Sequence, residues 1–154
     1  MKMTSRSVRW LFILLMIIAP LFYAWYTHYQ RNHFTCESHL IIVDENSRVD
    51  ALMTFTFNNG AGSYDSTGEY SQAGQETVAI SNKIAFRYWR EEGRIIMISS
   101  DTNERPKKDE PFRHSIPDFF RQRDHGISIQ LVPVNAASYL FIFGNTPAFY
   151  CAKG

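Results

Sequence analysis

The longest apolar run in the chain lies near its N-terminus, from Trp10 to Tyr26, and contains no charged residue. A helix over this run rises roughly 25 Å, so flanking residues to about Tyr29 are needed to cross a hydrocarbon core of about 30 Å. Trp25, Tyr26 and Tyr29 suit the end of such a helix, because amphipathic rings favour the membrane interface. The pattern predicts a transmembrane helix over residues 10–29.

Charged residues flank the apolar run asymmetrically. Lys2, Arg6 and Arg9 all precede it, and the first acidic residue of the chain is Glu37. The positive-inside bias therefore predicts that residues 1–9 form a cytoplasmic tip and that the rest of the chain lies across the membrane. A cleaved secretory signal shares the basic start and the apolar run. Because this run ends in bulky aromatic residues rather than a small-residue cleavage site, an uncleaved signal anchor is the preferred interpretation.

From His39 the pattern changes to that of β-strands, which have a two-residue period. Residues 39–43 form a compact apolar run, and residues 49–57 then alternate between apolar and polar side chains. Residues 84–90 alternate in the same way and are joined by a tight Glu-Glu-Gly connection to an apolar strand at 94–99. These segments predict two hairpins, the second being the strongest local signal in the domain.

The segments between the predicted strands are polar or rich in glycine. Residues 58–68 carry several glycine and asparagine residues and are predicted to form a loop, and the weaker alternation around 78–80 suggests a short strand. Residues 101–110 are a charged run of the kind that is usually solvated. Residues 115–126 have the signals of one or two helical turns, in which Phe119 and Phe120 would plug one end of the sheet.

Two further strands are predicted near the C-terminus, at 126–132 and 138–144. Both faces of the second are apolar, which is typical of a central strand or of one that faces a partner: Tyr139, Phe141 and Phe143 against Leu140 and Ile142. The total is seven or eight short strands with one minor helix. We therefore expect an α+β chain, in which a transmembrane helix precedes a mainly antiparallel sheet that is strongly curled or closed into a small barrel.

Length and charge fit this organisation. After the anchor and a polar stalk at residues 30–35, residues 36–154 suffice for one domain with its own core. The chain has 16 basic and 15 acidic residues, and three of the basic ones belong to the tip. The external domain thus has no basic bias, and no direct binding of nucleic acid is expected. A nine-residue tip is too small to act on DNA, so any cytoplasmic output is expected to pass through another protein.

The chain has two cysteines, Cys36 and Cys151, at opposite ends of the predicted domain. In an oxidising compartment a disulfide between them is the default expectation. It would staple the two ends of the domain and contribute roughly 4 to 5 kcal/mol in the chain-entropy account. A metal pair and a reactive thiol are the rival interpretations, and the absence of a CxxC motif and of clustered histidines argues against both.

Signatures of catalysis are absent from the sequence. It contains no GxSxG, HExxH, P-loop or GxGxxG motif, and its histidines are scattered. We therefore expect no catalytic residues, no metal site and no cofactor, and predict that the protein is not an enzyme. Histidine titrates near physiological pH, so four of the five are candidate acid sensors: His28, His33, His114 and His125.

Several short motifs along the chain form a recognisable set. A basic tip and one span are followed by Cys36, an F-x-Y strand within 84–88, Ile-Pro-Asp-Phe-Phe at 116–120 and Pro-Ala-Phe-Tyr-Cys at 147–151. This set resembles the FidL-like family of bacterial inner-membrane proteins, which includes the MyfF and PsaF type of fimbrial regulatory proteins.

The resemblance implies a partner role in fimbrial or virulence gene expression. Such proteins accompany membrane-anchored activators of the ToxR type, which have a cytoplasmic winged-helix domain, one span and a periplasmic region. The small protein stabilises the activator through periplasmic contact and helps it respond to acidity or bile. By analogy with accessory proteins of the ToxS and VtrC type, the domain is expected to be a lipocalin-like barrel completed by a strand from the regulator.

Two mechanisms stay open within this hypothesis. The domain either only shields the regulator, or also senses a signal through its histidines or through an apolar ligand such as a bile salt or fatty acid in the barrel mouth. The candidate contacts for partner or ligand are the aromatic residues of the second half: Phe119, Phe120, Tyr139, Phe141 and Phe143. The alternative function is a membrane-anchored periplasmic binding protein for a small apolar ligand, without a regulator.

Overall fold

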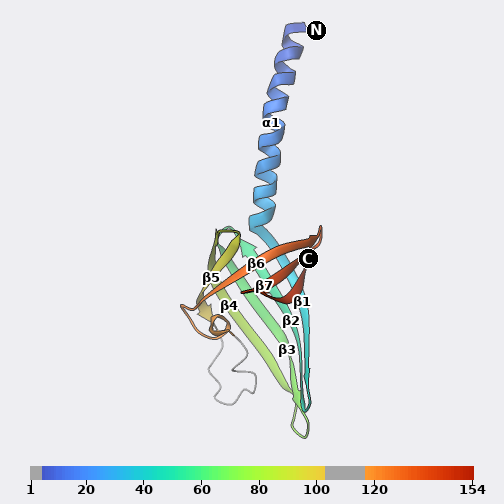
Figure 1. The fold of residues 1–154 in the computed structure, drawn as a ribbon, viewed down its shortest axis with the longest axis vertical. Coiled ribbons are helices and arrows are strands. Elements are labelled where there is room, and N and C mark those ends of the chain that lie inside the picture. Colours follow the sequence, from blue (N-terminus) through green and yellow to red (C-terminus); the bar gives the residue numbers. More distant parts are fainter. Residues whose placement is uncertain (1–4, 103–116) are drawn as a thin grey trace. The chain divides into compact units, whose positions relative to one another are not determined.

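The computed structural model describes residues 5–102 and 117–154. The chain divides into two units, Met1–His33 and Phe34–Gly154, of which the first is helical and the second is built from strands (Figure 1).

The first unit is the long helix α1 (Ser5–Asn32). Its segment Val8–Asn32 is long and apolar enough to cross a membrane, because 25 helical residues rise roughly 37 Å. The predicted apolar helix is thus present and extends three residues beyond Tyr29. Side-chain hydrogen bonds link residues one turn apart near its end. For example, Gln30 Nε2 donates to Tyr26 Oη at 2.6 Å.

The stalk expected at residues 30–35 is not a separate segment. The helix continues to Asn32, and the first strand begins at His33. The His33 ring stacks on Tyr29 with 4.1 Å between ring centroids, and its Nδ1–H donates to the Tyr29 carbonyl at 3.1 Å. This hydrogen bond satisfies one of the carbonyl groups left free at the end of a helix.

Within the described residues, the second unit is a closed antiparallel barrel in which each strand pairs with the next along the chain and the last returns to the first. The predicted combination of an apolar helix with a small antiparallel barrel is confirmed. The strands are β1 (His33–Asp44), β2 (Ser47–Asn58), β3 (Ala61–Gln72), β4 (Val78–Glu91), β5 (Arg94–Thr102), β6 (Gly126–Asn135), β7 (Ser138–Phe143) and β8 (Thr146–Lys153).

The predicted loop at residues 58–68 is wrong. Only Asn59 and Gly60, both with positive φ, form the turn, and β3 pairs with β2 over its full length. The glycines of β3 permit close packing rather than a loop. A Cβ at Gly62 would lie 2.5 Å from the Phe86 ring, and one at Gly68 would lie 2.7 Å from the Ala51 Cα. Glycine within a strand often marks such a close approach.

Two strand boundaries also differ from expectation. The short strand suggested at 78–80 and the predicted strand at 84–90 are one continuous strand, β4. At the other end of the domain β6 continues through Pro133 to Asn135, with a register shift at that point, so the connection to β7 is shorter than predicted. Proline is tolerated where a ladder is irregular, because the missing N–H is not needed there.

The barrel interior is filled by aromatic rings and aliphatic side chains, as the alternating pattern predicts. Ile84, Phe86 and Tyr88 of β4 point inward and are at most 6% exposed. The short 3-10 helix η1 (Asp118–Phe120) places Phe119 and Phe120 in the core, as predicted. The Phe120 ring meets Tyr64 at 4.9 Å, and Phe119 meets Phe86 at 5.9 Å. Ser115, the expected start of this helix, lies outside the described residues.

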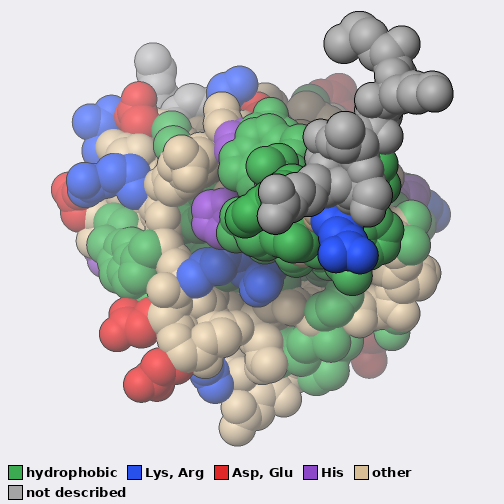
Figure 2. Space-filling model, turned by 90° about the horizontal axis from the view of Figure 1, so that it is seen from above, with side chains coloured by type: hydrophobic (Ala, Val, Ile, Leu, Met, Phe, Trp, Pro, Cys, Tyr) green, Lys and Arg blue, Asp and Glu red, His purple; other side chains and the backbone are tan. Residues whose placement is uncertain are grey.

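The outer surface of β2 to β5 is charged. Outward side chains on these strands include ion pairs such as Lys83 Nζ with Asp65 Oδ1, 3.1 Å apart. Figure 2 shows acidic and basic side chains gathered mainly toward the left of the view, whereas hydrophobic and uncharged side chains form much of the lower right. The barrel therefore presents faces of different character.

Ser99 is a fully buried polar side chain that holds the turn before β6. Its Oγ–H donates to the Gln122 carbonyl, and the same oxygen accepts from the His125 amide at 3.2 Å. Its backbone N–H and C=O also bond to His125 and Asp124. Ser99 thus fixes the segment that connects the aromatic plug to β6.

Replacing Ser99 by alanine is expected to lower the free energy of unfolding by about 1 to 3 kcal/mol, because the part-buried Gln122 carbonyl and His125 amide lose their hydrogen bonds to its hydroxyl. Urea unfolding followed by far-ultraviolet circular dichroism measures this loss. The exposed neighbour Ser100, whose Oγ–H donates to the Ala85 carbonyl, is the matched control, and Ser100→Ala should change stability by no more than about 0.5 kcal/mol. Equal effects of the two substitutions would contradict the role given to Ser99.

Candidate binding interface

The barrel closes through a short seam between its first and last strands. β1 and β8 are in register at two positions, Cys36 with Lys153 and Glu37 with Ala152. β2 and β3, by contrast, pair along twelve positions. Cys36 and Cys151 form a disulfide across the seam, with Cα atoms 5.4 Å apart, and both are fully buried. The expected covalent staple therefore lies where β8 separates from β1.

Beyond the seam, β1 has an open edge. Its residues 38–44 continue past the two positions at which β8 is in register with it. Ile41 and Val43 on its outer face are 47% and 71% exposed, and Ile42 on its inner face is 39% exposed. An unpaired strand with apolar side chains on both faces is a template for another strand. We refer to residues 38–44 as the β1 edge.

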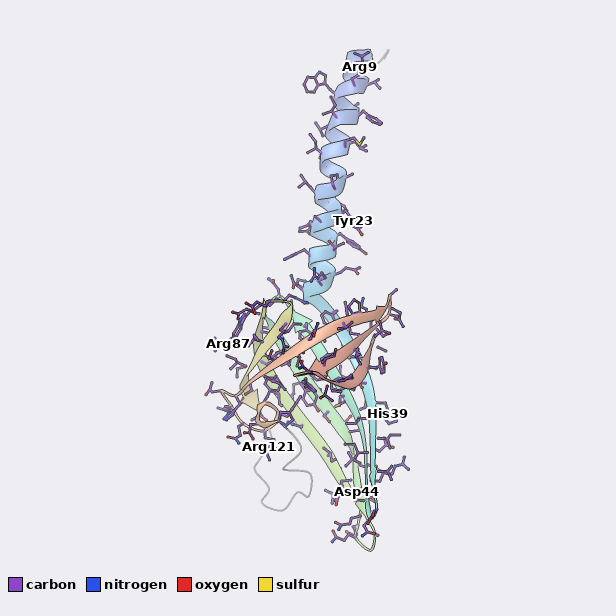
Figure 3. The ribbon with its side chains drawn as sticks, viewed as in Figure 1. Arg9, Tyr23, His39, Asp44, Arg87 and Arg121 are labelled. Carbon is purple, nitrogen blue, oxygen red and sulfur yellow. A yellow bond between two sulfur atoms is a disulfide. The ribbon has the colours of Figure 1, made fainter. Side chains whose placement is uncertain are left out.

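A charged cluster lies on the outer face beside this edge. His39 Nε2–H donates to Asp50 Oδ1 at 2.6 Å, and Arg48 donates to Asp50 Oδ2 at 2.9 Å. These hydrogen bonds hold the pKa of the Asp50 carboxyl below its usual value. The bond from His39 has the larger effect and that from Arg48 the next largest. Figure 3 shows His39 on β1, directed away from the barrel. The cluster thus ties β1 to β2 next to the open edge.

The four histidines selected from the sequence belong to different parts of the chain. His28 accepts a hydrogen bond from Asn32 at 3.1 Å and, like His33, belongs to the helical unit. His125 precedes β6, and its Nδ1–H donates to the Arg123 carbonyl at 2.9 Å. His114 lies outside the described residues. The histidine beside the open edge is His39, which the sequence interpretation did not select.

The aromatic residues expected to contact a partner or ligand point into the barrel. Phe141 is fully buried, and its ring lies 4.7 Å from Phe149 and 5.0 Å from Phe55. Tyr139 and Phe143 are partly buried against the same core. Phe119 and Phe120 form the plug described above. In the described part of the chain these five residues pack the interior, and the exposed apolar side chains near the seam include Ile41, Ile42 and Val43 of β1.

The sequence contains a signal for the β1 edge. The run from His39 to Val43 contains four consecutive apolar residues, and in an alternating strand such a run must place apolar side chains on both faces. Sequence alone could not show that β8 leaves this strand unpaired, because that depends on the register of strands far apart along the chain.

The described residues form a helix of membrane-spanning length and a closed, disulfide-linked barrel in which part of β1 is an exposed edge. In comparison with known proteins, residues 33–151 match the YqeJ C-terminal domain, and the chain belongs to this family. The match covers most of the barrel. No curated protein matches the chain.

Replacing both cysteines by serine is expected to lower the free energy of unfolding by up to about 4 to 5 kcal/mol. The disulfide closes a long loop in the unfolded chain, and without it the unfolded chain gains conformational entropy. Urea unfolding of the full-length protein in detergent, followed by circular dichroism, measures the change. Wild-type protein unfolded with a thiol reductant should reach the same lower value. Unchanged stability in both samples would show that the seam does not need its covalent link.

The charged cluster predicts a pH dependence. Because the folded pKa of Asp50 is lowered, its contribution to stability is present above the unfolded pKa of about 3.9 and is lost as the pH falls through the folded pKa. In His39→Ala the pKa of Asp50 should rise toward its usual value. A carbon-detected NMR titration of the Asp50 carboxyl measures it, with His125→Ala as control. An identical midpoint in wild type and His39→Ala would contradict this assignment.

Proposed function

We propose that this protein is a single-pass accessory protein of the bacterial inner membrane that binds and stabilises a membrane-anchored, ToxR-like transcription activator. In this proposal α1 is an uncleaved anchor with residues 1–9 in the cytoplasm, and the barrel lies in the periplasm. The length and apolar composition of Val8–Asn32 support the anchor. The disulfide supports an oxidising compartment, because such bonds persist outside the cytoplasm.

The observation that carries the proposal is the β1 edge. Its apolar side chains occupy both faces of a strand that has β2 on one side only beyond the seam. A partner strand added there would gain main-chain hydrogen bonds, and its alternating side chains would cover Ile41 and Val43 on one face and Ile42 on the other. A regulator with a periplasmic segment able to form a strand meets this requirement.

The resemblance to the FidL-like family supports the nature of the partner. It connects this kind of domain with activators that have a winged-helix cytoplasmic part and with fimbrial or virulence genes. The filled barrel interior favours recognition at its surface over enclosure of a ligand, because the described core is occupied by rings such as Phe55, Phe57 and Phe141. Any acid or amphiphile signal is therefore proposed to act on the complex through its exposed groups.

The proposal is tested by crosslinking tagged full-length protein in its native membrane, at neutral and mildly acidic pH, and identifying the captured proteins by mass spectrometry. We expect recovery of a single-span protein with a cytoplasmic winged-helix domain. Different recovery at the two pH values would favour sensing over shielding. Recovery of no such protein at either pH would overturn the proposal and leave a ligand-binding protein as the better hypothesis.

A substitution at the edge should weaken capture of the regulator. Ile41→Lys places a charge on the outer face of the unpaired strand, and charged residues oppose strand addition at edges. Leu52→Lys is the matched control, because Leu52 has similar exposure, 44% against 47%, but lies on β2 between two paired strands. We expect roughly tenfold lower recovery for Ile41→Lys, as for a hot-spot residue, and wild-type recovery for Leu52→Lys. Equal recovery of both would remove the β1 edge from the interface.

A further inference from the structure

The last three strands of the barrel differ from the others in charge. β6, β7 and β8 together contain one charged residue, Lys153, at the end of β8. Its Nζ lies 4.7 Å from the centroid of the Tyr139 ring and donates to the Ala136 carbonyl. On β4 alone, four residues are charged: Lys83, Arg87, Arg90 and Glu91. The core does not require this lack of charge. It is formed by the inward side chains, so the outward positions of these strands could carry charged residues.

Five large outward side chains of these three strands are apolar, whereas Gln130, which is opposite Ile142, is polar. Val132 is opposite Leu140 across β6 and β7, and Leu140 is opposite Tyr150 across β7 and β8. Ile142 extends this set along β7. Tyr150 is 63% exposed and Val134 is 51% exposed, whereas the other three are partly exposed. We call these five residues the outer strip.

On the same strands, other side chains point inward to the core. The strip residues alternate with them and therefore point outward. Leu131, Phe141 and Phe149 alternate with the strip residues and pack in or against the core. The strip therefore adds little to the core, and it leaves apolar area in water. Contiguous exposed apolar patches mark interaction sites, and the centres of protein interfaces are poor in charge and rich in tyrosine.

The position of the strip identifies its occupant. Tyr150 lies on β8, the strand that borders the seam, one residue before Cys151 and two residues before the β8 position paired with Glu37. A strand that adds to the β1 edge enters the sheet beside β8. The rest of the domain that carries this strand must then lie next to it, and the outer strip is the uncharged surface on that side of the seam.

We infer that the outer strip is a second contact surface for the regulator, which docks apolar side chains of its periplasmic region against Tyr150 and Leu140. This inference rests on the proposed function, because it takes the regulator as the partner that adds a strand to β1. The strip fits a protein surface rather than an anionic lipid surface, since it has no lysine or arginine to attract headgroups. Two contact surfaces would fix the orientation of the partner as well as its register.

The test introduces a photoreactive phenylalanine derivative at one position of the full-length protein in its native membrane. The three positions are Ile41 on the β1 edge, Tyr150 on the outer strip and Trp89, which is 44% exposed on the outer face of β4. All three are surface side chains, so the fold should be retained. Mass spectrometry identifies the crosslinked product at each position.

We expect the same single-span, winged-helix protein to be crosslinked at Ile41 and at Tyr150, and not at Trp89. Crosslinking at Ile41 without Tyr150 would overturn the second surface and leave the proposed function intact. Crosslinking at neither position would overturn both. A second copy of this chain or lipid as the product at Tyr150, or equal crosslinking at Trp89, would also overturn the inference.

A binding measurement gives an independent result. Tyr150→Asp should lower recovery of the regulator roughly tenfold or more, because it places a charge at the centre of an apolar contact. Trp89→Asp is the control and should recover the regulator as wild type does. Circular dichroism confirms that both variants keep the barrel. Wild-type recovery by a folded Tyr150→Asp variant would contradict the inference.

Discussion

The closure between β1 and β8 is the constraint on which the rest of the barrel depends. The other strand pairs are neighbours in sequence and form through short connections or, between β5 and β6, across a longer segment. The first and last strands must instead be brought together from positions 115 residues apart, and their register covers two residue pairs. The buried Cys36–Cys151 disulfide holds them at this point. It thereby fixes where pairing ends and where the open part of β1 begins.

Sequence reasoning found the features that depend on local pattern. Alternating residues on β2 and β4 indicated which side chains fill the core, and the buried pair Phe119 and Phe120 followed from their position in a short helical motif. It failed at β3, where Gly62 and Gly68 were interpreted as loop residues although they allow close packing with Phe86 and Ala51. It also missed the exposed face of β1, because an unpaired edge is defined by what a distant strand does not reach. The sequence also did not show that Tyr139, Phe141 and Phe143 of β7 face the core. Both faces of this strand are apolar, so either face could be the buried one.

The described barrel packs most of its aromatic side chains inside and has two kinds of surface outside. β2 to β5 carry charged side chains and ion pairs, which suit contact with water. The β1 edge and the outer strip are apolar, and both adjoin the seam. In the proposed function the disulfide-linked seam places these two surfaces beside each other, so that one partner can use both. The cluster of His39, Asp50 and Arg48 places hydrogen-bonded charged side chains beside the edge.

Hydrogen exchange along β1 tests the central claim most directly. The amides of residues 38–44 are compared in membranes that contain the full-length protein alone and in membranes where the winged-helix regulator is co-expressed. The account predicts that these amides become protected when the regulator is present, because an added strand bonds to the open edge. The amides of β2 and β3, already paired in the barrel, should change little. Unchanged exchange of residues 38–44 in a verified complex would contradict the account and place the regulator elsewhere on the protein.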